Sequence, residues 1–439
     1  SLTPLDIVKY TTAFADVIIT GDNKKVVVGR DARLSGQMLN QLVCGTLISK
    51  GIDVIDLDLS TTPTVEMVVV KEKAAGGIIL TASHNPKQWN ALKLLNAEGE
   101  FISAEQGAAI IDKVKSSDFQ YNEIDSIGSY ELMEGTIDWH IDEIIKLSMV
   151  DVNAISKRNF TIAVDAVNST GGIAVPALLR KLGVQNVIEI YCEPTGKFPH
   201  NPEPLPEHLN DLSDTVLKNN ADLGITVDPD VDRLAFVSEN GDMFGEEYTL
   251  VAVADYVLSQ KKGNTVSNLS STRALKVITE KHGASYAASA VGEVNVVKMM
   301  KETDAIIGGE GNGGIILPEL HYGRDALVGI ALFLSHLAKC GKPMSHLKAS
   351  YPTFIISKNK IELTPEIDVD SILTQLQEKY KKQPINTIDG VKIEFDEEWV
   401  HLRKSNTEPI IRIYAEGSTM RVADSLANKI KSDIKEMIS

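Results

Sequence analysis

Alternate carboxylates in one short loop are the strongest candidates for chemistry in this sequence. Asp228, Asp230 and Asp232 lie in Asp-Pro-Asp-Val-Asp-Arg, directly after the apolar stretch Leu223 to Val227. On an extended segment alternate side chains project to the same side, and three carboxylates there suit a small hard cation such as Mg²⁺. A solvated acidic turn would have the same spacing. The apolar stretch before the loop, and Arg233 as a phosphate ligand after it, favour the metal site.

A serine follows a second apolar stretch, Gly77 to Leu80, in the sequence Thr-Ala-Ser-His-Asn-Pro. Ser83 is the candidate nucleophile, His84 can orient an anion beside it, and Pro86 makes the chain turn. A serine hydrolase is the competing interpretation, but the Gly-x-Ser-x-Gly elbow is absent, and a histidine adjacent in sequence is badly placed to act as the base. A phosphoryl group on Ser83 would add oxygen ligands to a magnesium ion held by the aspartates.

A glycine-rich loop follows a third apolar stretch, Ala305 to Ile307, and contains Glu310 and Asn312 in Glu-Gly-Asn-Gly-Gly. Its glycines let the backbone approach a ligand closely, and the carboxylate and the amide suit a pair of sugar hydroxyls. The loop lacks the Gly-Lys-Ser/Thr ending and the Gly-x-Gly-x-x-Gly spacing of nucleotide-binding loops. A sugar-binding loop is therefore expected, with a flexible turn as the alternative.

A polar loop near the C-terminus combines a guanidinium, two hydroxyls and an amide, from Arg403, Ser405, Asn406 and Thr407. Donors of this kind suit a phosphate group. The loop is therefore predicted to bind phosphate, with an ordinary hairpin turn as the alternative.

Two basic side chains are candidates for proton transfer beside Ser83. Arg30 follows the apolar strand Lys25 to Gly29, and Lys93 lies ten residues past Ser83. Either cation would stabilise charge as an oxygen of the transferring phosphoryl group gains or loses its proton. Basic residues on a protein surface are far commoner than catalytic ones, so both assignments depend on the Ser83 loop.

Similar elements precede the first three loops. Short β-branched strands alternate with amphipathic helical stretches such as Met38 to Lys50, which is an α/β pattern. A further strand lies upstream in each case, at Val26 to Asp31, Phe160 to Asn168 and Thr265 to Ser271. Open α/β sheets bind ligands at the carboxyl ends of their strands, where these loops lie. We therefore expect three related α/β mixed-sheet domains, each contributing one loop.

The last part of the chain has a different pattern. An α+β domain with helices on one face of its sheet is expected from strands at Gly390 to Phe395, Val400 to Arg403 and Ile410 to Glu416 and helices at Asp370 to Lys382 and Met420 to Met437. The four expected domains span residues 1–149, 150–250, 251–352 and 353–439.

Composition and charge limit the classes of partner. The 439 residues suit roughly three or four domains. The 60 acidic and 44 basic residues give a net charge of −16, which repels nucleic acid and anionic membranes. The expected partner is a small anionic molecule in a local basic pocket, and the oligomeric state is open.

Three widely separated cysteines, Cys44, Cys192 and Cys340, argue against a disulfide framework and favour a reducing compartment, with the cytoplasm as the expected location. The first residues lack a basic segment followed by an apolar run, and no stretch approaches the ~18 apolar residues that span a bilayer. Neither secretion nor a membrane span is expected. The sequence begins Ser-Leu-Thr-Pro without an initiator methionine, so we expect residues of the natural chain to precede it.

In this order, the four loops resemble those of the α-D-phosphohexomutase superfamily, which includes phosphoglucomutase, phosphomannomutase and phosphoglucosamine mutase. The resemblance covers nearly the whole chain. It implies a four-domain enzyme around a central cleft, in which phosphorylated Ser83 gives its phosphoryl group to a hexose 6-phosphate. The bound hexose 1,6-bisphosphate, which is also the activator, then reorients and returns its other phosphate to Ser83, leaving a hexose 1-phosphate.

The resemblance also implies residue roles. Asp228, Asp230 and Asp232 would hold Mg²⁺ together with the phosphorylated Ser83. Arg30 and Lys93 would act in acid/base catalysis. Glu310 and Asn312 would bind O3 and O4 of the sugar. The non-transferring phosphate would be bound by Arg403, Ser405, Asn406 and Thr407.

The sugar loop favours one member of the superfamily. Many bacterial relatives carry a histidine where this chain has Gly314, and the loop looks closest to the Glu-Glu-Asn-Gly-Gly form of archaeal-type phosphoglucosamine mutases. Glucosamine phosphate is therefore the expected substrate, with phosphomannomutase or phosphoglucomutase activity as the alternative. The superfamily also has a Gly-Ile-Arg-Gly-like strand before Leu-Thr-Pro, which this sequence lacks. A magnesium-dependent sugar phosphatase and a non-catalytic sugar-phosphate sensor are the alternatives from other classes.

Overall fold

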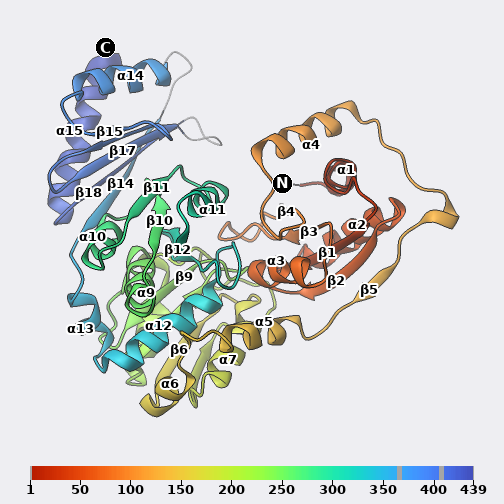
Figure 1. The fold of residues 1–439 in the computed structure, drawn as a ribbon, viewed down its shortest axis with the longest axis horizontal. Coiled ribbons are helices and arrows are strands. Elements are labelled where there is room, and N and C mark those ends of the chain that lie inside the picture. The colour runs from red at the N-terminus through yellow and green to blue at the C-terminus, as the bar shows by residue number, and fades with distance from the viewer. Residues whose placement is uncertain (1, 363–367, 405–409, 439) are drawn as a thin grey trace.

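The structure, a computed structural model, describes residues 2–362, 368–404 and 410–438 of the chain. It contains four units, one for each sheet. In Figure 1 the first unit lies at the right and the fourth at the upper left, with the second and third units between and below them.

The first unit is a sheet covered by helices on both faces. Its elements are β1 (Lys25–Arg30), β2 (Asp53–Leu59), β3 (Gly76–Leu80), β4 (Leu92–Leu95), β5 (Tyr130–Leu132), α1 (Pro4–Ile18), α2 (Gly36–Ser49), α3 (Thr62–Lys71), α4 (Ala104–Ser116) and α5 (Thr136–Ile145). The strand order is β4-β3-β1-β2-β5, with β4 antiparallel to β3 and the other pairs parallel. Val26 and Val28 pack with α1, α2 and α4, whereas Val27 packs with α3. Alternate side chains of β1 therefore bury opposite faces of the sheet.

The second and third units repeat this sheet without β5. Their orders are β7-β6-β8-β9 and β11-β10-β12-β13, each with an antiparallel last strand. The second unit contains β6 (Thr161–Asp165), β7 (Asn186–Ile190), β8 (Leu223–Val227), β9 (Leu234–Ser238), α6 (Val152–Arg158), α7 (Gly171–Lys181) and α8 (Asn210–Lys218). The third contains α9 (Glu246–Gln260), β10 (Asn264–Asn268), α10 (Ala274–Lys281), β11 (Tyr286–Ser289), α11 (Glu293–Glu302), β12 (Ala305–Glu310), β13 (Gly314–Ile316), α12 (Ala326–Cys340) and α13 (Met344–Ala349).

Helix α12 joins the cores of the second and third units. It packs against α6, α7 and β9 of the second unit and against α9 and β13 of the third. One continuous apolar core therefore runs through both units, from Ile137 of α5 to Tyr351. The sheets of the first and fourth units have separate cores, although α5 of the first unit packs into the core of the second and third units.

The fourth unit is an antiparallel sheet of order β14-β18-β17-β16-β15. Its elements are β14 (Ile355–Glu362), α14 (Val369–Lys379), β15 (Ile385–Asn386), β16 (Val391–Glu394), β17 (Trp399–Lys404), β18 (Ile410–Gly417) and α15 (Met420–Ile438). Leu376 of α14 and Ile430 of α15 share one core with Val400 and Leu402 of β17. Val400 and Leu402 are alternate residues of the strand, so both helices cover the same face.

The predicted fold class is confirmed, because three related α/β units precede an α+β unit. Helix α9 runs across the division that the sequence indicated after residue 250. In each of the first three units the predicted functional loop joins the third strand to the antiparallel fourth strand. The serine loop lies between β3 and β4, the aspartate loop between β8 and β9, and the sugar loop between β12 and β13.

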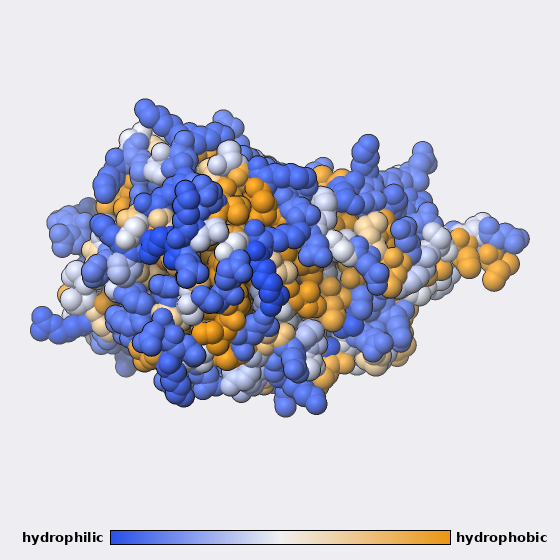
Figure 2. All heavy atoms as spheres, turned by 90° about the horizontal axis from the view of Figure 1, so that it is seen from below, coloured by the Kyte–Doolittle hydropathy of each residue, from blue (hydrophilic) through white to orange (hydrophobic). Residues whose placement is uncertain are grey.

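The surface is mainly polar on the face that Figure 2 shows, with apolar side chains on the tip that projects at the right. The segment between α4 and α5 exposes several large apolar side chains, among them Ile124 with 79% exposure and Tyr130 with 52%. Of the helices in the described part of the chain, none is both long enough and apolar enough to cross a membrane.

Candidate active site

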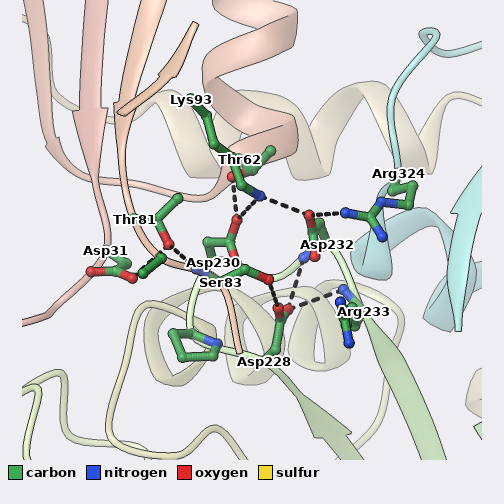
Figure 3. A network of polar contacts seen from close by, with 12 residues as sticks. Asp31, Thr62, Thr81, Ser83, Lys93, Asp228, Asp230, Asp232, Arg233 and Arg324 are labelled. Carbon is green, nitrogen blue, oxygen red and sulfur yellow. Dashed lines mark hydrogen bonds and ion pairs between the residues drawn. The ribbon is translucent and has the colours of Figure 1, made fainter. Parts of the chain in front are cut away.

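The serine loop and the aspartate loop meet at Ser83 and Asp228. Ser83 Oγ donates a hydrogen bond of 2.7 Å to Asp228 Oδ2 (Figure 3). The backbone of Ser83 has a φ of 48°, in the left-handed region, and its N–H donates to Thr81 Oγ1 at 2.9 Å. The nucleophile that the sequence predicts therefore touches the first of the three predicted metal ligands.

The three aspartates form one buried cluster. One carboxylate oxygen of each lies within 4.8 Å of the others, and Asp228, Asp230 and Asp232 all have 0% exposure. The loop bends at Val231, whose φ of 66° is unfavourable for a β-branched residue and is the kind of strain found at functional loops. The N–H groups of Asp232 and Arg233 donate to Asp228 Oδ1 at 3.1 and 3.0 Å, which fixes that carboxylate.

The donor set of this cluster fits magnesium. Oδ1 of Asp230 and Oδ1 of Asp232 are buried and have no hydrogen-bond partner within the described part of the chain. A buried carboxylate oxygen without a partner is unfavourable, and a hard divalent cation with oxygen ligands would satisfy both atoms. An oxygen of a phosphorylated Ser83 would lie beside the same cluster, because the serine already contacts Asp228.

Lys93 of β4 brings a positive charge from the first unit to this cluster. Its Nζ donates to Asp230 Oδ2 at 2.6 Å and to Asp232 Oδ2 at 2.9 Å (Figure 3). Burial alone would lower the pKa of Lys93, but the two carboxylates outweigh burial and hold the pKa above its ordinary value. Lys93 therefore carries its proton at neutral pH while these contacts persist.

Arg324 is a site residue that sequence reasoning missed. Its Nη2, Nη1 and Nε donate to Asp232 at 2.7 Å, to Glu310 at 2.9 Å and to Glu293 at 2.8 Å. Burial would raise the pKa of Asp232, but Arg324 and Lys93 outweigh it and hold that pKa below its usual range. The arginine thus joins the aspartate loop to the sugar loop. The only signal for it was indirect, since three buried carboxylates need a cation.

Arg33 was also missed, although it lies three residues past Arg30. Arg33 is 1% exposed, and its Nε donates to Asp31 Oδ2 at 3.1 Å. Its terminal nitrogens donate at 2.6 to 2.9 Å to four backbone carbonyls of the serine loop, those of Ser83, Asn85, Pro86 and Trp89. A buried guanidinium with four carbonyl acceptors fixes the conformation of this loop.

Arg30 lies apart from these contacts. Its Nε and Nη2 pair with Asp58 Oδ1 at 2.8 and 2.7 Å. In the described ranges, no hydrogen bond or ion pair joins Arg30 to Ser83 or to the three aspartates. Of the two acid/base candidates from the sequence, Lys93 is the one that contacts the cluster.

His84 and Arg233 meet at Glu203. His84 Nδ1 lies 3.4 Å from Ser83 Oγ, and its Nε2 lies 3.9 Å from Glu203 Oε1. Burial, with help from the charge of Arg233, lowers the pKa of His84 to about 4, so the ring is neutral at pH 7. Arg233 Nη1 donates to the same oxygen of Glu203 at 3.3 Å, and its Nε is buried with no partner among the residues described. That nitrogen suits a phosphate oxygen.

The sugar loop turns the carboxylate of Glu310 inwards. Its Oε2 accepts from Arg324, and its Oε1 accepts from Asn268 Nδ2 at 2.9 Å and from the N–H of Gly292 at 3.1 Å. Glu310 is 5% exposed. Its carboxylate is therefore held rigidly, and a sugar would meet it in this one orientation.

The other half of the sugar loop lies against β9. Asn312 Oδ1 accepts from the N–H of Gly314 at 3.1 Å. Gly313 has a φ of 81°, and a Cβ there would lie 1.8 Å from the carbonyl oxygen of Leu234. The glycine is required because the loop passes directly over the start of β9.

The first turn of α3 also contacts the aspartate loop. Thr62 Oγ1 donates to Asp230 Oδ2 at 2.5 Å, and the N–H of Thr62 donates to the carbonyl of Asp230 at 2.9 Å. The partial positive charge of a helix N-terminus favours carboxylates at this position.

Beside this turn, two histidines connect the first and third units. Asp325 Oδ2 accepts from His140 Nε2 at 2.8 Å and from His321 Nε2 at 3.0 Å, which are distances of direct hydrogen bonds. His140 Nδ1 lies 2.8 Å from Thr64 Oγ1, and His321 Nδ1 lies 3.4 Å from Glu66 Oε2. Burial would lower the pKa of His321, but Asp325 and Glu66 outweigh it and raise the pKa to about 10. His321 is therefore an imidazolium at neutral pH.

Arg403 lies near the end of β17, with its Nε 3.3 Å from Asp389 Oδ2. The other predicted phosphate ligands, Ser405, Asn406 and Thr407, lie outside the described residues.

Family models match four consecutive segments of the chain. They are described as phosphoglucomutase/phosphomannomutase, alpha/beta/alpha domains I, II and III, and the C-terminal domain. The matched residues are 1–121, 138–241, 245–354 and 362–432. The segments follow the order of the four units of the structure.

Curated relatives match over almost the whole chain. A protein of Thermococcus kodakarensis named phosphoglucomutase/phosphomannomutase is 36% identical over 427 residues, which cover 95% of this chain and 92% of the relative. A probable phosphoglucosamine mutase of Methanopyrus kandleri is 33% identical, covering 94% of this chain and 90% of the relative.

Solved structures share the fold. A phosphoglucomutase/phosphomannomutase family protein of Burkholderia thailandensis superimposes with a TM-score of 0.86 at 25% identity, covering 99% of this chain and 94% of its own. An N-acetylphosphoglucosamine mutase of Aspergillus fumigatus, solved with GlcNAc-6P and magnesium, has a TM-score of 0.56 at 15% identity, covering 94% of this chain and 83% of its own. Because the family models match all four units in order, this chain belongs to the phosphoglucomutase/phosphomannomutase family of phosphohexomutases and is an intramolecular phosphotransferase.

Proposed function

We propose that this enzyme interconverts a hexose 6-phosphate and a hexose 1-phosphate through a phosphoserine at Ser83, with glucosamine phosphate as the preferred substrate. The observation that supports the mechanism most is the 2.7 Å contact between Ser83 Oγ and Asp228 Oδ2, at the edge of a buried aspartate cluster. A nucleophile in that position can carry a phosphoryl group whose charge the site is built to balance.

The proposed reaction conserves phosphate. In the first half, the bond between phosphorus and Ser83 Oγ breaks while phosphorus bonds to O1 of the hexose 6-phosphate, which gives a bound 1,6-bisphosphate. In the second half, the bond between phosphorus and O6 breaks and the phosphoryl group returns to Ser83, which leaves a hexose 1-phosphate. In the first half a proton passes from the sugar hydroxyl to Ser83 Oγ, and in the second half it passes back.

Each residue has a proposed part in that scheme. Asp228, Asp230 and Asp232 would hold magnesium, which when bound would neutralise negative charge on the transferring phosphoryl group. Lys93 is the proposed proton donor to the departing oxygen, because its two aspartate contacts keep it protonated. Glu310 and Asn312 are the proposed ligands of the sugar hydroxyls. Arg233 and Arg403 are the proposed ligands of the phosphates of the substrate.

The names of two relatives bear on the choice of sugar. The Methanopyrus kandleri relative is named probable phosphoglucosamine mutase at 33% identity. The Thermococcus kodakarensis relative, at 36% identity, is named phosphoglucomutase/phosphomannomutase, so these two activities are the second candidate. Glucose, mannose and glucosamine phosphates differ at C2, whereas the proposed sugar ligands Glu310 and Asn312 are assigned to O3 and O4, so these two residues do not decide among the three sugars.

We further propose that each unit contributes one part of the active site. Residues 1–149 carry the serine, and residues 150–250 carry the metal ligands. Residues 251–352 carry the sugar ligands, and residues 353–439 carry a phosphate ligand. The three cysteines of the chain are free, which supports a reducing compartment such as the cytoplasm as the place where the enzyme works.

A substrate comparison tests the proposed function. The enzyme is mixed with glucosamine 6-phosphate, glucose 1-phosphate or mannose 1-phosphate, each with Mg²⁺ and the matching 1,6-bisphosphate, and the products are followed by ³¹P NMR. We expect isomerised sugar phosphate with no loss of total ester phosphate, and the highest kcat/KM for glucosamine phosphate. Release of inorganic phosphate without isomer would identify a phosphatase, and binding without turnover would identify a sensor.

Ser83→Ala tests the phosphate carrier. We expect kcat to fall by at least about 10³-fold, because the variant lacks the nucleophile, and we expect the phosphorylated species to disappear from intact mass spectra. Ser116→Ala is the matched control, since Ser116 is an exposed serine of α4 that donates to the carbonyl of Lys113. Removal of divalent cations with EDTA should stop turnover, and added Mg²⁺ should restore it.

A further inference from the structure

The carboxylate of Asp389 lies between two units and beside a proposed phosphate ligand. It belongs to the turn that joins β15 to β16 in the fourth unit. Its Oδ2 accepts from the N–H of Val291 in the third unit at 3.0 Å and lies 3.3 Å from Nε of Arg403. One oxygen atom therefore contacts both the third unit and the arginine.

The backbone of this turn lies directly against β17 at Arg403. Gly390 has a φ of 69°, and a Cβ there would lie 2.1 Å from the carbonyl oxygen of Leu402 and 3.0 Å from Cα of Arg403. The carbonyl of Asp389 accepts from His401 Nε2 at 2.6 Å. Asp389 is thus fixed against β17 at the position of the arginine.

The segment that Asp389 contacts, residues 291–293, also contacts the sugar loop and Arg324. Three consecutive residues make one contact each. Val291 N–H donates to Asp389, Gly292 N–H donates to Glu310 Oε1 at 3.1 Å, and Glu293 Oε2 accepts from Arg324 Nε at 2.8 Å. Arg324 also donates to Asp232. Asp389, residues 291–293 and Arg324 therefore connect Arg403 with the sugar loop and with the aspartate cluster.

The chemistry of the ion pair suits a positioning role. Asp389 faces Nε, whereas an end-on bidentate grip on phosphate uses the two terminal nitrogens of the guanidinium. A carboxylate at Nε limits the rotamers of a long side chain without occupying that edge. An arginine fixed before the ligand arrives loses less conformational entropy on binding.

We propose that Asp389 is a positioning residue, which fixes Arg403 for the phosphate of the substrate and anchors the fourth unit to the segment that holds the sugar loop. The inference rests on the proposed role of Arg403 in phosphate binding. Asp389 thereby contributes, through Arg403, to binding of the non-transferring phosphate. Arg403 would bind the non-transferring phosphate equally well in the ground state and in the transition state. Loss of this binding therefore raises KM more than it lowers kcat.

Steady-state kinetics of Asp389→Ala and Asp389→Asn test this role. We expect KM for the hexose phosphate to rise about tenfold in Asp389→Ala, with kcat changed less than about threefold, since the carboxylate that forms an ion pair with Nε of the arginine is lost. Asp389→Asn retains an acceptor for Val291 N–H but lacks the charge, and we expect an intermediate KM. Dissociation constants for glucose 1-phosphate, measured by calorimetry, should follow the same order, and they do not depend on turnover.

Two comparisons separate positioning from general structural damage. In Arg403→Ala/Asp389→Ala, KM should equal that of Arg403→Ala within about twofold, because Asp389 acts through the arginine. Glu246→Gln is the matched control, as it removes an ion pair of 2.8 Å with Lys358 between the same two units, and its KM should stay within about twofold of the parent value.

Three results would overturn the inference, and they differ in what they imply. Multiplicative effects in the double variant would mean that Asp389 acts independently of Arg403. An unchanged KM in Asp389→Ala, with a raised KM in Arg403→Ala, would remove Asp389 alone from the scheme. Unchanged dissociation constants in Arg403→Ala would show that the fault lies in the proposed phosphate role of the arginine.

Discussion

Arg324 balances three buried carboxylates that come from separate parts of the chain. Asp232, Glu293 and Glu310 each accept from a different nitrogen of its guanidinium. Lysine could not replace it, because one ammonium is a single point of charge whereas the planar guanidinium offers donors in three directions. This side chain therefore joins the proposed metal ligands and the proposed sugar ligands through direct hydrogen bonds.

Arg324→Lys should expose that dependence. We expect a loss of about 3–5 kcal/mol in the free energy of unfolding, because one ammonium cannot pair with all three buried carboxylates, and a fall in kcat/KM of roughly 10²-fold. Urea denaturation followed by tryptophan fluorescence, together with the mutase assay, measures both. Arg180→Lys, in an exposed pair with Glu189, should change stability by less than about 0.5 kcal/mol. Equal effects of the two substitutions would contradict this account.

Single residues also mark the limit of prediction from the sequence. Ser83 and the three aspartates could be predicted, because they stand in short loops directly after strands whose burial is evident. Arg324 could not, since its partners lie 14 to 92 residues away. Arg33 could not, since its role depends on the conformation of the serine loop. Arg30, which the sequence predicts as an acid/base candidate beside Ser83, pairs instead with Asp58.

The loop between the third and fourth strands is the element that carries the site in each of the first three units. Strand and helix positions were predictable because β-branched runs and amphipathic periodicity are local signals. The antiparallel fourth strands were not, because β4 and β13 are short and their pairing depends on the loop before them. The contact of the sugar loop with β9 of the neighbouring unit is equally non-local.

Gly313→Ala tests how closely the sugar loop is held. The new Cβ would lie 1.8 Å from a backbone oxygen at a φ of 81°, so we expect a loss of more than about 2 kcal/mol in stability and a higher KM for the sugar. Gly45→Ala is the contrasting control, because Gly45 lies inside α2 with no atom within 4 Å of the new Cβ. That substitution should stabilise the enzyme by about 0.5–1 kcal/mol. A thermal melt of each variant distinguishes the two.

Over the whole molecule, the first three units are fastened to one another by polar contacts near the site. Thr62 of the first unit bonds Asp230 of the second, and Glu66 and His140 face His321 and Asp325 of the third. The imidazolium of His321 is stabilised by Asp325 and Glu66. Its charge state therefore affects how firmly the first unit is attached.

This junction gives stability a defined pH dependence. The folded-state pKa of His321, raised to about 10, lies above its ordinary value of 6.5, so its contribution is complete below about pH 6.5 and is lost as the pH rises through 10. We expect the free energy of unfolding to fall between pH 7 and pH 10, and to fall less steeply in His321→Gln. His282→Gln, which removes a partly exposed pair with Asp255, should keep the parent slope. A parent slope in His321→Gln would contradict the assignment.

Helix α12 has a consequence for synthesis on the ribosome. The sheet of the second unit is complete at Ser238, yet α12, which packs against α6, α7 and β9 of that unit, ends at Cys340. At a translation rate of about 5–20 residues per second, roughly 5–20 s pass between synthesis of the last strand of this sheet and synthesis of the end of α12. During that interval the nascent chain exposes the apolar surface of α6, α7 and β9 that α12 later covers, so the second unit is prone to aggregation until α12 has been synthesised.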